Sequence, residues 1–161
     1  MASQQDIARL NIEIMNKFLE DLIKVIEDDC KNYFVKKMQE SIQDVVYDAY
    51  APTQYKRRMT DEGGLQDPNN YILEAKLDAN GRVCVFMKNM ARGVGKAYYI
   101  DEGIVTGRNF YDWKKSNAYY YATHGGFERD FYTYMEFIVV NDSELQELIK
   151  RGMKRKGWKI K

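Results

Sequence analysis

The feature that most constrains the fold is helical periodicity over residues 5–48, where no glycine or proline interrupts the chain. A continuous helix of that length would measure about 65 Å, which is more than one small domain needs. We therefore expect either a break near Asp28–Asp29 or an N-terminal part that projects and packs on a neighbour. The apolar stripe comprises Ile7, Leu10, Ile14, Phe18, Leu22, Val25 and Ile26, then Cys30, Tyr33, Phe34, Met38, Ile42, Val45 and Val46.

Length and composition predict one folded domain over residues 1–161. Of these residues 45% are hydrophobic and 30% are charged, and the net charge of +1 gives no bulk argument for a nucleic-acid or membrane partner. The charge is uneven: residues 1–50 carry 6 basic and 10 acidic residues, giving −4, whereas residues 150–161 carry 7 basic and no acidic ones. With no secretion signal and no apolar run of about 18 residues, we expect no membrane span and a protein that is cytosolic when made.

The segment YDAYAPTQYKRRMTDEGGLQDP, residues 47–68, combines tyrosines, a basic cluster and both prolines of the chain. Pro52 disfavours a helical conformation for the residue before it, and Gly63–Gly64 and Asp67–Pro68 predict two turns. Long irregular loops in small domains are uncommon and are usually functional or disordered. The tyrosines and Leu65 argue for an ordered, functional loop.

Two strands and two helices follow. Alternation over 71–77 and 83–88 around Asn80–Gly81 predicts a β-hairpin. Residues 128–140 favour a helix, with a strand as the alternative. A last helix is expected to open at 141–143, with a capping box of Ser143 and Gln146, and to end at Gly157, before a possible edge strand over 158–160. The fold class is α+β, with a long N-terminal helix, an antiparallel β-sheet and C-terminal helices.

The sequence offers no constellation for catalysis, a cofactor or a metal. His124 is the single histidine and lies in a predicted loop. Gly93–Lys96 lacks the spacing and the Ser or Thr of a phosphate-binding loop. Cys30 and Cys84 have no CxxC spacing, so we expect two buried thiols rather than a disulfide or zinc site. We expect no enzymatic activity.

Three runs resemble small virion proteins of tailed phages that infect Gram-positive bacteria. The first is Tyr47…Tyr50–Arg58, continued by Gly63–Gly64–Leu65 and Asp67–Asn70. The second is Ile100–Ile104 followed by Tyr111–Asp112–Trp113 and Ser116. The third is Ser143–Leu145…Leu148–Lys154. The resemblance covers the chain from about residue 40 to its C-terminus, and these proteins are similar to the head-to-tail joining or tail-completion proteins of long-tailed phages.

This resemblance implies an α+β subunit of a ring, usually of six copies, at the neck of the virion. The implied partners are other copies of the chain, neighbouring neck or connector proteins, and tail-tube or tail-terminator proteins. DNA would pass through the lumen without specific binding, and assembly would take place in the host cytoplasm. The predicted interface residues are Tyr50, Pro52, Tyr55, Arg57, Arg58, Leu65, Tyr111, Trp113 and Phe127.

Three alternatives stay open from the sequence. The protein has another virion or assembly role, or it binds nucleic acid through Lys56–Arg58 and the basic C-terminus. The third alternative is a small hydrolase or nuclease that uses scattered carboxylates. Salt-sensitive DNA binding would distinguish the second, and metal-dependent activity the third.

Overall fold

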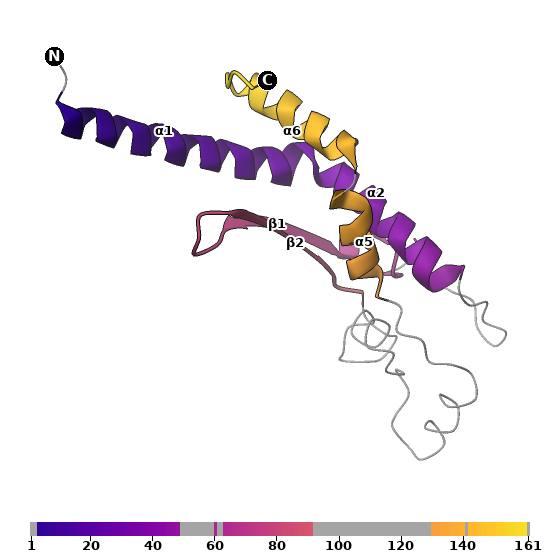
Figure 1. Cartoon of the computed structure of the whole chain (residues 1–161). Coiled ribbons are helices and arrows are strands. Elements are labelled where there is room, and N and C mark those ends of the chain that lie inside the picture. The colour runs from indigo at the N-terminus through magenta and orange to yellow at the C-terminus, as the bar shows by residue number, and fades with distance from the viewer. Residues whose placement is uncertain (1–2, 49–59, 61–62, 92–129, 141, 161) are drawn as a thin grey trace. The chain divides into compact units, whose positions relative to one another are not determined.

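The computed structural model describes residues 3–48, 60, 63–91, 130–140 and 142–160 (Figure 1). Its two strands form an antiparallel sheet, and the long N-terminal helix and C-terminal helices are present, which confirms the predicted α+β class. In chain order the elements are α1 (Gln4–Lys24), the π-helical η1 (Val25–Asp29), α2 (Lys31–Ile42), the π-helical η2 (Gln43–Tyr47), the 3-10 turn η3 (Pro68–Asn70), β1 (Tyr71–Leu77), β2 (Val83–Asn89), α5 (Phe131–Val140) and α6 (Ser143–Arg155).

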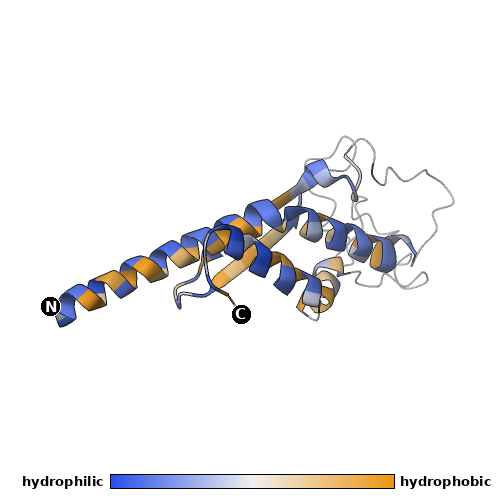
Figure 2. Ribbon diagram, turned by 90° about the horizontal axis from the view of Figure 1, so that it is seen from above, coloured by the Kyte–Doolittle hydropathy of each residue, from blue (hydrophilic) through white to orange (hydrophobic). Residues whose placement is uncertain are grey.

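The helical stretch expected over 5–48 consists of α1, η1, α2 and η2. It begins with a capping box, in which the Ser3 Oγ accepts from the Asp6 N–H at 3.2 Å and the Ser3 N–H donates to the Asp6 carboxylate at 3.0 Å. These bonds lower the pKa of Asp6. The regular helix stops at η1, where the Cys30 N–H donates to the Val25 carbonyl five residues back. This interruption contains Asp28–Asp29, near which a break is one of the two alternatives expected from the sequence. Figure 2 shows apolar residues recurring along α1.

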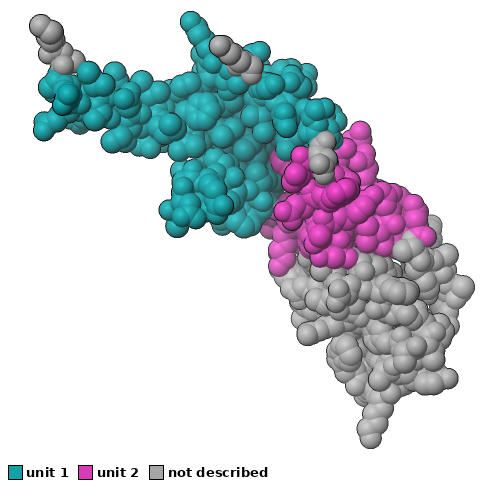
Figure 3. All heavy atoms as spheres, viewed as in Figure 1, with its two compact units in different colours: residues 1–33, 73–86, 142–161 teal, residues 34–72, 87–141 magenta. Residues whose placement is uncertain are grey.

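The chain divides into two compact units, coloured separately in Figure 3. Unit 1 comprises residues 1–33, 73–86 and 142–161, and unit 2 comprises residues 34–72 and 87–141. Each unit is described separately below. The assignment of 1–161 to a single domain stays a prediction.

Unit 1 is built around the packing of α6 on η1. Val25, Ile26, Cys30 and Met153 are buried, and burial raises the pKa of the Cys30 thiol to about 11. Gly152 permits the close approach: a Cβ at this position would lie 2.6 Å from the Asp29 carboxylate and closer still to Val25 Cγ1. The helices therefore meet at a distance that only glycine allows.

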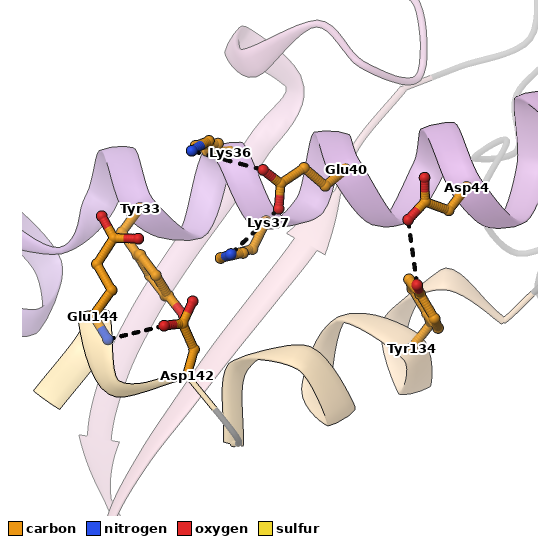
Figure 4. A network of polar contacts seen from close by, with 8 residues as sticks. All are labelled: Tyr33, Lys36, Lys37, Glu40, Asp44, Tyr134, Asp142 and Glu144. Carbon is orange, nitrogen blue, oxygen red and sulfur yellow. Dashed lines mark hydrogen bonds and ion pairs between the residues drawn. The ribbon is translucent and has the colours of Figure 1, made fainter.

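The two ends of α6 differ from the sequence prediction. Asp142, not Ser143, is the N-cap: its carboxylate accepts from the Glu144 N–H at 2.8 Å and from the Tyr33 hydroxyl at 3.0 Å (Figure 4). The C-terminal end is a Schellman turn in which Gly157 has φ +91° and the Trp158 N–H donates to the Met153 carbonyl. Residues 158–160 do not form the edge strand expected as a possibility, because this turn directs Trp158 back onto α1.

The β-hairpin matches its prediction. Gly81 has φ +75° in the turn, and the Asp78 carboxylate holds the turn by accepting from the Asn80 and Arg82 N–H groups. These contacts, with Arg82 the largest contributor, lower the pKa of Asp78. Cys84, expected to be buried, is only half-buried. Within unit 1, the Ala75 N–H donates to the Glu27 carboxylate at 2.9 Å and so connects β1 to η1.

In unit 2, α5 packs against η2. Residues 131–140 are therefore a helix, as favoured from the sequence, and not the alternative strand. Phe131, Met135, Met38 and Ile42 are buried in its core. At the surface the Tyr134 hydroxyl donates to Asp44 at 3.2 Å (Figure 4), which raises the pKa of Tyr134.

We predict that Gly152→Ala destabilises the protein by about 1–3 kcal/mol, because the added methyl group forces α6 away from η1. At an unobstructed helical site the same change would stabilise by up to about 1 kcal/mol. Urea unfolding followed by circular dichroism measures the difference, and Lys154→Ala, on an exposed position of α6, is the control. A Gly152→Ala protein as stable as the parent would contradict this packing.

Candidate interaction surface

The first part of α1 is an apolar helix that is exposed to solvent. All residues from Ser3 to Lys17, named here the exposed α1 segment, are exposed. Five of them are large and apolar, with exposed fractions between 47% and 62%. Single exposed apolar residues are ordinary on a protein surface, whereas a contiguous group marks an interaction site. The five are Ile7, Leu10, Ile12, Ile14 and Met15.

The charges of this segment are confined to one side of the helix. At 100° per residue, Asp6, Arg9, Glu13 and Lys17 fall within a sector of about 80°. Two of them pair with each other, Arg9 with Glu13 at 3.4 Å, and Lys17 pairs with Asp21 at 3.3 Å. Two acidic and two basic residues give the segment no net charge. Most of the helix circumference is therefore uncharged.

Trp158 marks where the exposed part of α1 ends. Its ring meets Phe18 edge-to-face, with 5.1 Å between ring centroids, and its indole N–H donates to the Asp21 carboxylate at 3.1 Å. This hydrogen bond, helped by Lys17, holds the pKa of Asp21 below its ordinary value of 3.8. From Phe18 onward the apolar side of α1 packs within unit 1, and before Phe18 it does not.

The C-terminal segment carries the basic residues that the sequence singles out. Arg155 forms an ion pair with Asp29 at 2.6 Å, and Lys150 pairs with Glu147 at 3.1 Å. Arg151, Lys154, Lys156 and Lys159 are exposed. Part of the basic charge is therefore neutralised within the chain.

Most of the predicted interface residues lie outside the described part of the chain, and their roles stay predictions. These are Tyr50, Pro52, Tyr55, Arg57, Arg58, Tyr111, Trp113 and Phe127. Leu65 is described: its side chain is 4% exposed and belongs to the core of unit 2. In this chain the Leu65 side chain packs internally, and its role at an interface stays a prediction.

A network of amide side chains fixes the segment around Leu65. The Leu65 carbonyl accepts from the Asn89 side chain at 2.6 Å and from the Tyr71 hydroxyl at 3.0 Å. Burial raises the pKa of that hydroxyl. Gln66 and Gln39 each donate to the backbone carbonyl of the other, at 2.9 and 2.8 Å. The C-terminal end of the predicted loop is thus held within its own unit.

The residues predicted to form an interface do not include the exposed α1 segment, although its apolar residues can be recognised in the sequence. The stripe through Ile7, Leu10 and Ile14 predicts one apolar side. Ile12 and Met15 extend the apolar sector well beyond the width that one packing face requires.

Two further properties concern the described residues only. Within them, no group of three or more His, Cys, Asp and Glu side chains is placed to hold a metal ion. Among the helices that the structure describes, none is long and apolar enough to cross a membrane.

Residues 6–155 match the model of the YomN protein family. The chain therefore belongs to the YomN family, a phage-derived family, and is a phage-associated protein. No curated protein and no solved structure matches the chain.

We predict that Asp21→Asn destabilises the protein in a pH-dependent way. Because the folded-state pKa of Asp21 is depressed, its carboxylate stabilises the protein above about pH 3.8, and this stabilisation is lost as pH falls through the folded-state pKa. The gap in unfolding free energy between parent and variant should thus be widest at neutral pH and narrow below pH 4. Urea unfolding from pH 7 to pH 3 measures it, with Glu20→Gln as the neighbouring control. A gap independent of pH would contradict the role of the charge.

Proposed function

We propose that this protein is a structural virion protein of a tailed phage, which forms a ring at the neck as a head-to-tail connector or tail-completion protein. The observation that carries the proposal is the exposed α1 segment. The large apolar residues of this segment extend over about 200° of the helix circumference, which is wider than the apolar stripe of an ordinary surface helix. Such a helix, exposed in the isolated chain, is typical of a subunit that its neighbours complete.

The distribution of apolar residues around α1 supports a cyclic assembly. Ile7 and Ile12 lie about 140° apart around the helix axis, and they are 51% and 62% exposed. One packed helix covers an apolar stripe of roughly 100°, so a single partner does not cover both residues. A ring subunit has two neighbours, one through each of its two interfaces.

Membership of a phage-derived family supports a virion role. In this proposal the partners are other copies of the chain, in a ring that is usually hexameric, together with adjoining neck, tail-tube or tail-terminator proteins. DNA passes through the lumen without specific binding, and the protein has no enzymatic role. In this proposal Tyr50, Pro52, Tyr55, Arg57 and Arg58 form a docking loop against the next subunit or an adjoining neck or tail protein.

A second candidate function is nucleic-acid binding through Lys56–Arg58 and the basic C-terminus. Its support is the density of basic residues over 150–161, 7 with no acidic residue. The ion pairs of Arg155 and Lys150 within the chain weigh against it. Binding of this kind would weaken steeply as salt rises.

Electron microscopy of lysates from a phage with a stop codon in this gene tests the proposal. We expect separate DNA-filled heads and finished free tails, because each half assembles and the joint is missing. Purified protein added to the lysate should restore infectivity, and a lysate of the parent phage is the control. Intact, infectious particles from the mutant would refute the neck assignment.

A further inference from the structure

We infer that the side of the exposed α1 segment formed by Ile7, Asn11 and Ile14 is a self-association element of this protein, and that the same side of a second copy covers it, with Asn11 facing Asn11 of that copy. The inference deepens the proposed function and rests on its homo-oligomeric assembly, for which it names the surface. Three observations carry it: the position of Asn11, the distribution of charge, and the place where internal packing of α1 begins.

Asn11 lies in the middle of the apolar sector. Around the helix axis it falls about 40° from Ile7 on one side and about 40° from Met15 on the other. All three residues are exposed. An amide side chain carries both donors and an acceptor, so a second asparagine satisfies it within an apolar contact. An asparagine at one core position of a helix seam specifies register and oligomeric state, at a cost in stability.

The spacing of Ile7, Asn11 and Ile14 is that of such a seam. These residues alternate at intervals of four and three, and Phe18 continues the alternation. At Phe18 the seam is covered by Trp158 of the same chain. Residues 4–17 thus provide about 20 Å of helix, at 1.5 Å per residue, for a partner helix.

Charge favours an identical helix over an acidic or basic partner. The seam itself contains no charged residue. Arg9 and Glu13 pair with each other, and Lys17 pairs with Asp21, so little charge is left to attract a highly charged surface. Because the segment has no net charge, two copies approach without net repulsion.

The test is analytical ultracentrifugation of the purified full chain over a range of concentrations, with Asn11→Asp compared with Asn16→Asp. Both asparagines are exposed on α1, and they lie about 140° apart around its axis. The two variants therefore add the same charge to the same helix on different sides. Circular dichroism checks that both keep the helix content of the parent.

We expect the parent protein to self-associate, and Asn11→Asp to raise its dissociation constant by at least about tenfold at pH 7, because facing carboxylates repel. Association of this variant should recover at pH 4.5, since a proton shared between two close carboxylates is held more tightly than by one alone. Asn16→Asp, about 140° from Asn11 around the helix axis, should raise the dissociation constant clearly less than Asn11→Asp does at pH 7.

A parent that is monomeric at every concentration would overturn the inference, as would equal effects of the two variants. An oligomer whose dissociation constant is unchanged by Asn11→Asp would also overturn the inference. The neck assignment would not be affected by that result, because the microscopy of mutant lysates tests it separately. Conversely, infectious particles from the stop-codon phage would remove the neck role and leave this self-association in place.

Discussion

The close approach of α6 to η1 at Gly152 is the contact on which unit 1 depends. Without a side chain at this position, α6 comes near enough for Met153 and Val25 to be buried together and for Arg155 to pair with Asp29. The Schellman turn at Gly157 then places Trp158 against Phe18 and Asp21. Each step depends on the one before it, because the turn reaches α1 only if α6 lies close to η1.

This packing also defines what is left uncovered. The apolar side of α1 and η1 is continuous through residues 7–26, yet the chain covers it only from Phe18 onward. Short helices that pack against nothing are only marginally stable in water. The exposed apolar side chains of residues 7–17 therefore contribute little to the stability of the isolated chain. A partner that buries the segment would account for these exposed side chains, and this is the basis of the assembly role proposed above for a member of a phage-derived family.

Local signals in the sequence predicted much of the fold. Helical spacing predicts the N-terminal stretch, Asn80–Gly81 predicts the hairpin, and Gly157 predicts the end of α6, because each signal acts within a few residues.

Contacts distant in the chain were not predictable in this way. Trp158 and Asp21 are 137 residues apart, so the sequence around Trp158 equally permits a strand. Asp142 and Ser143 are both good N-caps, and Tyr33, far away in sequence, adds a hydrogen bond that only Asp142 receives. For the same reason the stripe on α1 indicates an apolar side but not which part of it the chain covers.

Hydrogen–deuterium exchange along α1, measured in dilute and concentrated protein, tests most directly whether partners cover the exposed α1 segment. Amides of residues 18–30 should be protected at both concentrations, because α6 and Trp158 cover them within the chain. Amides of residues 7–17 should exchange fast in dilute protein and become protected as the concentration rises. Exchange over residues 7–17 that stays fast at every concentration would contradict the account of α1 as the surface through which copies of this protein assemble.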